Sequence, residues 1–232
     1  MSQPKPLSVS VVIPALNEAG QIARAVETAL AAGAAEVIVA DGGSTDRTAE
    51  LAAAAGATVV TSAAGRAKQQ NAGAAMATGD VLIFQHADNW CGPATVQQIR
   101  AALADCSKQG GAFRQRIEAD GWLFRLLETG NALRVRVRRL PFGDQGIFMR
   151  REFFAKLGGF PEEPLMEDVL LMRAFRRQAK PVLLKGPHYV CARRWQRHGV
   201  VRQTLRNWRI QLAHWFGASP SALARSYRRH DG

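Results

Sequence analysis

Acidic side chains follow two apolar runs in the first half of the chain. Asp41 comes directly after the run at 36–40, and Asp88 follows the run at 81–84 within the segment QHADN (85–89). A carboxylate at the end of a buried strand is well placed to accept hydrogen bonds from a base or a ribose. It also suits a hard divalent cation that binds diphosphate oxygens, because Mg²⁺ and Mn²⁺ prefer oxygen ligands. The alternative for Asp88 is a solvated acid in a turn.

Capping and turn residues offer a simpler explanation for two neighbouring segments. In PALNE (14–18), Asn17 can cap the next helix and Glu18 can complement its dipole. In DGGSTD (41–46), the two glycines permit positive φ, and the three residues after them can cap the helix that follows. A ligand-binding role stays open beside these structural roles.

Short β-rich runs alternate with helical patterns and must position these residues. The expected strands are Val9–Ile13, Glu36–Ala40, Thr58–Thr61 and Val81–Phe84, and the expected helices lie at about 18–32, 46–55 and 67–77. This alternation predicts an α/β fold with a doubly wound, mostly parallel sheet and right-handed crossovers. Ligands of such sheets bind beyond the carboxyl ends of the strands. The chain has neither GxGxxG nor GxxxxGK[ST], which disfavours a nicotinamide enzyme and an ordinary P-loop NTPase.

The second half contains two further segments with the residues for chemistry. Glu167-Asp168 opens a helical pattern at about 165–178, where first-turn acids offset the helix dipole. Two adjacent acids on a helix point in different directions, so only one of them should reach the crevice. The segment FGDQG (142–146) precedes an expected strand at Ile147–Arg150, and its glycines allow close approach of the backbone. A Gly-rich turn is the alternative there.

Positive charge is concentrated in the second half. The 232 residues carry a formal net charge of +12 and are 47% hydrophobic, which predicts one large domain or one domain with an appendage and excludes wholesale disorder. Residues 1–112 hold 7 basic and 9 acidic side chains, whereas residues 113–232 hold 24 and 10. The second half therefore carries the basic residues that would bind an anionic partner.

Cysteine content and hydropathy indicate the compartment. The three cysteines include no CxxC pair, which disfavours a zinc site or a disulfide framework and fits a reducing environment. The first residues show no signal-peptide pattern, and no apolar stretch reaches the length that spans a bilayer. We expect a soluble, cytoplasmic protein.

Seven segments together resemble a known family. In order and spacing, VSVVIPALNE (9–18), VIVADGGSTD (37–46), GRAKQQNAGA (65–74) and VLIFQHADN (81–89) are similar to family 2 glycosyltransferases of the GT-A fold. The resemblance continues through FGDQGIFMRR (142–151), PLMEDVLLMRAFRR (164–177) and ARRWQRHG (192–199). The short length and the HAD, GDQG, MED and RRW set look most like a small bacterial subgroup named transferase 2, rSAM/selenodomain-associated. Some members of that subgroup are labelled arsenosugar biosynthesis glycosyltransferases.

The resemblance implies an organisation and a reaction. A single GT-A domain would span residues 1–200, with a Rossmann-like nucleotide half at 1–90 and an acceptor and catalytic half at 91–200, followed by a basic helical tail at 201–232. The implied activity is that of an inverting, metal-dependent hexosyltransferase. It would move a sugar from a nucleotide-diphosphate sugar, with a UDP-sugar as the leading candidate, to an unidentified acceptor. The implied cofactor is Mg²⁺ or Mn²⁺.

The same resemblance assigns residues to roles. Asp168 would be the catalytic base, and Glu167 would position sugar hydroxyls or the acceptor. Glu18 would lie near the ribose and Asp41 at the base. The implied nucleotide- and substrate-binding residues are Pro14, Asn17, Glu18, Asp41, Arg66, Lys68, Asp144, Gln145, Arg193, Arg194 and Trp195.

The implied metal site departs from the family pattern at one position. Asp88 stands for the last acid of the family's DxD motif, but His86 replaces the first acid. His86 can be a metal ligand, a partner of a ligand or a packed imidazole. His188, which follows Gly186-Pro187, is a further candidate ligand.

The basic tail and the overall charge leave other interpretations open. The segment at 201–229 mixes arginines with Trp208, Trp215 and Phe216, as in an amphipathic helix on an anionic membrane surface at the inner face of the cell membrane. The favoured interpretation is a helix packed on the domain with a solvated basic face. A non-catalytic basic module for nucleic acid or membrane is a competing class, but no nucleic-acid motif is present and no specific nucleic acid is expected. A nucleotidyltransferase on a related α/β fold would release pyrophosphate instead of a nucleoside diphosphate.

Overall fold

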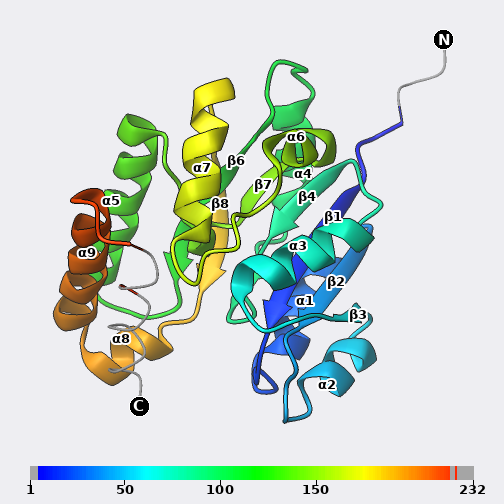
Figure 1. Ribbon diagram of the computed structural model, residues 1–232, viewed down its shortest axis with the longest axis horizontal. Helices are drawn as coiled ribbons and strands as arrows, with labels where there is room; N and C mark the ends of the chain where they lie inside the picture. The colour runs from blue at the N-terminus through cyan, green and yellow to red at the C-terminus, as the bar shows by residue number, and fades with distance from the viewer. Residues whose placement is uncertain (1–4, 220–222, 224–232) are drawn as a thin grey trace.

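An eight-stranded sheet with the order β3-β2-β1-β4-β7-β6-β8-β5 runs through the protein (Figure 1). The structure is a computed structural model, and the description covers residues 5–219 and 223. The strands are β1 (Val9–Ala15), β2 (Glu36–Asp41), β3 (Thr58–Thr61), β4 (Val81–Phe84), β5 (Asn89–Cys91), β6 (Gly110–Ile117), β7 (Ile147–Arg150) and β8 (Val182–Val190). The helices are α1 (Ile22–Ala31), α2 (Thr48–Ala54), α3 (Arg66–Met76), α4 (Thr95–Leu103), α5 (Trp122–Arg138), the 3₁₀ helix η1 (Gly143–Gln145), α6 (Arg151–Leu157), α7 (Glu167–Gln178), α8 (Arg193–His198) and α9 (Val200–Trp215).

The sheet is mostly parallel, as the sequence predicts. Strands β3, β2, β1 and β4 are parallel neighbours, and β6 and β8 form a second parallel pair. Strand β7 lies between these groups and is antiparallel to β4 and to β6. The start of β7 and the carboxyl ends of β1, β2, β4, β6 and β8 therefore share one edge of the sheet.

Alternate residues of the buried strands pack into two separate hydrophobic cores, one on each face of the sheet. Val9, Val11 and Ile13 of β1 pack with α1, α2 and α4 on one face. Val12 of β1 packs on the other face, where phenylalanines of α6 and α7 and alanines of α3 complete the core. Burial on both faces explains why these strands are nearly continuous in apolar residues.

Three helices, α1, α2 and α7, begin later than the sequence pattern predicts. Helix α1 begins at Ile22 instead of near Glu18, and its N-cap residue is Gln21. Asn17 is therefore not the cap of α1; it adopts a positive φ of 56° and its side chain accepts hydrogen bonds from Thr45 instead. Helix α7 begins at Glu167 because the preceding residue, Met166, is also in the left-handed region.

Helices α5 and α9 lie side by side at the end of the molecule remote from α2 (Figure 1). Both present apolar residues to solvent on part of their surface, including Leu126 of α5 and Leu205 of α9. Over the described ranges, no helix has both the length and the apolar composition that a membrane crossing requires.

The close pairing of β6 with β8 depends on a glycine and gives a testable prediction. A Cβ at Gly111 would overlap the backbone of Val182, including its carbonyl oxygen. Gly111→Ala should therefore lower the free energy of unfolding by about 2–4 kcal/mol, because the backbone on both strands would have to shift.

Gly130 of α5 provides the matched control in a urea unfolding experiment. A Cβ there would meet no atom within 4 Å. Gly130→Ala should stabilise the protein by up to about 1 kcal/mol, because alanine loses less backbone entropy than glycine in a helix. Equal unfolding midpoints for Gly111→Ala and the wild type would contradict this account of β6.

Candidate functional site

A pocket of about 400 Å³ opens at the shared edge of the sheet. It lies where β4 and β8 end and where η1 and α7 begin. Six of the residues predicted from the sequence line it, although they come from segments as far apart as α3 and α8. The lining residues are Arg66, His86, Asp88, Asn89, Phe142, Asp144, Pro164, Leu165, Met166, Asp168, Val169, Val190, Cys191, Trp195, Gln203 and Ile210.

Asp168 is fixed in this pocket by backbone donors. The N–H of Gly143 donates to its Oδ2 at 2.6 Å, and the N–H of Val169 donates to its Oδ1 at 2.8 Å. A Cβ at Gly143 would lie 2.8 Å from Nε2 of His86 and 3.2 Å from Oδ2 of Asp168. Because residue 143 is a glycine, the carboxylate of Asp168 and the imidazole of His86 can both approach the same piece of backbone.

Glu167 is buried next to Asp168 and is held by an arginine. It is 1% exposed and does not line the pocket. Its carboxylate accepts from Arg66, with Nε–Oε1 at 2.9 Å and Nη2–Oε2 at 3.2 Å. Burial raises the pKa of Glu167, and the negative charge of Asp168 raises it further, while Arg66 opposes both effects. Only Asp168 of this acidic pair therefore reaches the pocket.

Asp144 faces the pocket beside a second arginine, Arg134. Its Oδ2 accepts from Nε2 of Gln115 at 2.8 Å, and its Oδ1 is buried with no hydrogen-bond partner among the described residues. Burial raises the pKa of Asp144; Arg134 opposes this, and the acids Asp168 and Asp88 add to it. Burial also lowers the pKa of Arg134 to about 10.

Gln145 holds Arg134 in place. Its Oε1 accepts from Nη2 of Arg134 at 2.8 Å and from the N–H of Phe142 at 3.1 Å. The guanidinium carbon of Arg134 lies 3.4 Å from the centroid of the Phe142 ring. The GDQG segment thus positions both an acid and a cation at the pocket.

The predicted nucleotide-binding residues form a second group beside the pocket, at the ends of β1 and β2. Pro14 is buried in β1, opposite Ala40. Oδ2 of Asp41 accepts from the N–H groups of Gly43 and Ser44 at 3.1 and 3.0 Å. The N–H of Asn17 donates to Oγ of Ser44 at 2.9 Å, so the two loops are joined.

Three further predicted residues lie between this group and the C-terminal part. Lys68 is exposed on α3. Glu18 and Arg193 form an ion pair at 3.6 Å between Oε2 and Nη2, which links the loop after β1 to α8. Arg194 belongs to α8, but its side chain lies outside the described part of the structure.

Trp195 and His188 are packed side chains. Trp195 packs against the small cluster of Ile117, Phe124 and Ala192, and its buried Nε1 has no partner in the described part. His188 is fully buried in β8 and does not line the pocket. Neither of its ring nitrogens has a hydrogen-bond partner in the ranges described, and burial lowers its pKa to about 3.

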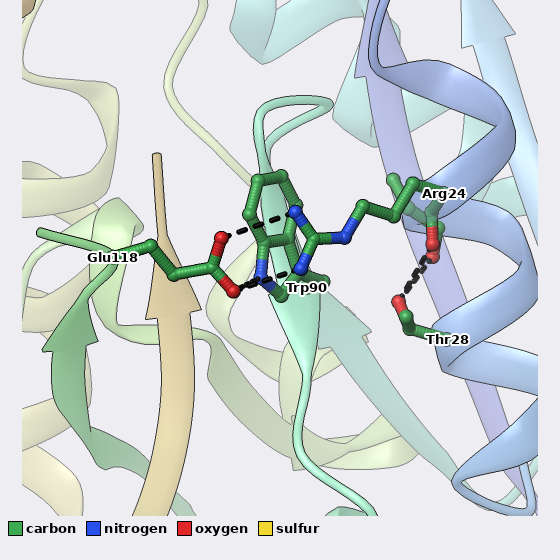
Figure 2. Close-up of polar contacts among 5 residues, drawn as sticks. Arg24, Thr28, Trp90 and Glu118 are labelled. Atoms are coloured by element: carbon green, nitrogen blue, oxygen red, sulfur yellow. Dashed lines mark hydrogen bonds and ion pairs between the residues drawn. The ribbon is translucent and has the colours of Figure 1, made fainter. Parts of the chain in front are cut away.

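A cluster that the sequence did not predict holds the strand after Asp88. Figure 2 shows the guanidinium of Arg24 lying over the Trp90 ring, 3.7 Å from its centroid, while both groups bond to the Glu118 carboxylate. Arg24 makes two bonds of 3.0 and 2.8 Å, and Nε1 of Trp90 donates at 2.8 Å. The cluster ties α1, β5 and the end of β6 together, two residues from Asp88.

The described residues contain no group of three or more His, Cys, Asp or Glu side chains arranged to hold a metal ion. Asp88 and Asp144 nevertheless line the same pocket, and the charge of Asp88 adds to the effect of burial in raising the pKa of Asp144. The pocket therefore offers carboxylate oxygens without a closed ligand cage.

Residues 10–158 match the family model described as Glycosyl transferase family 2. Because the match spans more than half of the chain, this protein belongs to that family of glycosyltransferases. The same comparison therefore identifies it as an enzyme. A comparison with curated proteins found no match.

Solved structures with the same fold include several glycosyltransferases. S. aureus TarS 1–349 aligns with a TM-score of 0.61 at 18% identity, over 80% of this chain and 61% of TarS 1–349. The same protein in complex with UDP-GlcNAc aligns with a TM-score of 0.62 at 18% identity, over 80% of this chain and 58% of the other. Glucosyl-3-phosphoglycerate synthase from Mycobacterium tuberculosis, in complex with Mg²⁺ and UDP, aligns with a TM-score of 0.58 at 23% identity. The alignment covers 79% of this chain and 70% of the synthase. At these identities the likeness shows the fold, which is GT-A; this chain spans about three fifths of TarS 1–349.

The Arg66–Glu167 pair predicts a pH-dependent loss of stability. Arg66→Met would leave the buried Glu167 carboxylate without its cation and raise its pKa further. A carboxyl whose pKa is higher in the folded protein favours folding below its unfolded pKa, and this contribution is lost as pH rises through the folded pKa. The free energy of unfolding of the variant should therefore be about 1–3 kcal/mol lower than that of the wild type near neutral pH, and the difference should be much smaller near about pH 4. The loss stays modest because the Arg66 side chain is partly exposed to solvent.

Urea unfolding of the variant at both pH values tests this effect. The double variant Arg66→Met/Glu167→Gln should recover most of the stability near neutral pH, because no uncompensated charge remains at position 167. A loss of equal size at both pH values would show that Arg66 acts through packing alone.

Proposed function

We propose that the protein is a metal-dependent, inverting hexosyltransferase that moves a sugar from a UDP-sugar to an acceptor. The observation that carries this proposal is the meeting of Asp168 and Asp88 in one pocket at the carboxyl edge of the sheet. One acid lies at the start of a helix from the second half, and the other follows a strand of the first half. This arrangement suits chemistry between a donor held by the first half and an acceptor held by the second.

The donor nucleotide would bind at the ends of β1 and β2. Pro14, Asn17, Glu18 and Asp41 lie at this edge; Glu18 would face the ribose and Asp41 the base. Arg66 and Lys68 at the start of α3 would lie toward the phosphates, since a helix N-terminus favours anions. UDP in the structures of TarS and of the mycobacterial synthase supports uracil as the base. In this assignment residues 1–90 hold the nucleotide, residues 91–200 hold the acceptor, and residues 201–232 form a tail.

Asp88 fits a divalent cation that depends on its substrate for further ligands. Mg²⁺ commonly takes one or two carboxylates from the protein and the rest from phosphates and water. Asp88 faces the pocket, and the unpartnered Oδ1 of Asp144 offers a second oxygen nearby. His86 borders the same space, whereas His188 lies behind Gly146 and would need a rearrangement to reach a cation. When bound, the cation would neutralise charge on the departing diphosphate.

Asp168 is the proposed base. The acceptor oxygen would form a bond to the anomeric carbon as the bond from that carbon to the diphosphate oxygen breaks, with the electron pair leaving on UDP. The acceptor proton would pass to Asp168, whose two backbone hydrogen bonds hold it in position. Glu167 and Arg66 would fix the start of α7, and Asp144 and Gln145 would face the sugar or the acceptor. Arg193, Arg194 and Trp195 would border the leaving group.

The finer assignments stay predictions. These are the small bacterial subgroup, a cytoplasmic location and peripheral contact with an anionic membrane through the tail. None of them is needed for the reaction proposed above.

Donor binding should depend on a divalent cation through Asp88. Among UDP-, GDP- and dTDP-sugars, we expect UDP-sugars with Mg²⁺ or Mn²⁺ to raise the melting temperature most, because a ligand stabilises the state that binds it. A donor at 100 times its Kd contributes about 2.7 kcal/mol. Asp88→Asn should lose the cation-dependent part of this shift, while Asp105→Asn, an exposed control, should keep it. If no nucleotide sugar shifts the wild-type transition at millimolar concentration, the proposal fails.

Removing the proposed base should separate turnover from binding. Asp168→Asn should slow release of UDP from the donor by about 10²–10⁴-fold, the usual contribution of a general base, and keep the donor-dependent thermal shift. Assays for UDP and for pyrophosphate measure the rate and identify the reaction class. Release of pyrophosphate would indicate a nucleotidyltransferase instead. Unchanged UDP release in Asp168→Asn would remove this residue from the mechanism.

A further inference from the structure

A groove of about 1020 Å³ lies between α5, α7 and α9, outside the pocket described above. Its walls include apolar side chains that are largely exposed, such as Leu126 and Val137 of α5 at 60% and 72%, and Leu205 and Trp208 of α9 at 52% and 56%. We call it the α5–α9 groove. Apolar side chains that gather in an exposed groove make it a candidate binding surface.

The α5–α9 groove adjoins the proposed catalytic pocket and shares three lining residues with it. Phe142, Met166 and Val169 line both spaces. Val169 follows Asp168 directly and donates its backbone N–H to that carboxylate. A ligand lying along the groove would therefore end beside Asp168, on the side that the donor nucleotide does not occupy.

The charged side chains that line the groove are all basic. Arg134, Arg138, Arg173 and Arg176 line it, and its described lining includes no Asp or Glu. Arg134 stands at the junction with the pocket, and its buried Nε has no hydrogen-bond partner in the described part. Guanidinium groups match the oxygens of a phosphate, so this surface complements an apolar ligand with an anionic head.

We propose that the acceptor is a long-chain lipid phosphate whose hydrocarbon chain lies in the α5–α9 groove and whose phosphate reaches Arg134. This inference rests on the proposed function and names the acceptor class for the same site. A phosphate oxygen would form the new bond to the anomeric carbon while the bond to UDP breaks and UDP takes the electron pair. Any proton on the attacking phosphate would pass to Asp168. The product would be a lipid-linked sugar phosphate.

A second copy of the chain fits the groove less well. Two copies meeting face to face through this surface would bring the same four arginines together. The chain also carries a net charge of +12, so association of copies through a basic face is opposed by repulsion.

Binding of a single-chain probe tests the proposal. Dodecyl phosphate, kept below its micelle concentration, should quench or shift the tryptophan fluorescence, since Trp208 lines the groove. Butyl phosphate should bind much more weakly, because each buried methylene is worth about fourfold in affinity. Inorganic phosphate and dodecyl maltoside should each bind at least about tenfold more weakly than dodecyl phosphate, since each supplies only part of the recognition.

Matched variants on the same helices locate the site. Leu126→Gln/Leu205→Gln should weaken dodecyl phosphate binding by at least about tenfold. Leu133→Gln, at an equally exposed position of α5 outside the groove lining, should leave it unchanged. Arg176→Gln should weaken binding, while Arg177→Gln, its exposed neighbour outside the lining, should not.

Donor binding distinguishes failure of this inference from failure of the proposed function. All four groove and control variants should keep the thermal shift given by a UDP-sugar. If that shift is present but dodecyl phosphate does not bind, or binds equally to the groove variants, the lipid acceptor is excluded and the glycosyltransferase assignment stands. Sedimentation of the protein with phosphatidylglycerol vesicles, without binding of the monomeric probe, would make the groove a membrane-docking face. A wild-type dimer that the groove variants dissociate would make it a subunit interface, and either result would overturn the proposal.

Discussion

Four carboxylates share a small volume at one edge of the sheet, and the protein has to compensate their mutual repulsion. Asp88, Asp144 and Asp168 line one pocket, and Glu167 is buried directly behind it. Burial and the neighbouring acids raise the pKa of Asp144 and of Glu167. Arg66 and Arg134, which come from two different helices, supply the opposing charge. The geometry of the site follows from where these two arginines are fixed.

The sheet topology makes this concentration of charge feasible. Strand β7 runs against its neighbours, so the segment before it, with Gly143, Asp144 and Gln145, arrives at the edge where the parallel strands end. Gly143 then donates to Asp168 and leaves space for His86, and Gln145 holds Arg134. One short segment thereby contributes Asp144 to the pocket, binds the proposed base Asp168 and holds Arg134.

The sequence predicted the fold and named six of the residues that line the pocket, because both depend on local patterns. Alternating apolar runs and helical segments define the parallel strands, and polar residues at strand ends must gather at one edge. The partners of those residues were not predictable in the same way. Arg66 binds Glu167, which is 101 positions away, and Arg24 meets Glu118 across 94 positions. Arg134 is one of many arginines in the second half, and no periodicity shows which arginine of a basic helix will lie beside the pocket acids.

The place of β5 in the sheet has a consequence for how the chain acquires its structure. Although β5 follows β4 closely in sequence, it lies at the far edge, where its pairing partner among the described strands is β8. The carbonyl of Asp88 likewise accepts from the N–H of Cys191, about a hundred residues later. During synthesis, β1 to β4 can therefore assemble long before Asp88 has its final neighbours. The part of the sheet formed by β1 to β4 can fold early, whereas the acidic pocket is completed only when the chain has been made past residue 191.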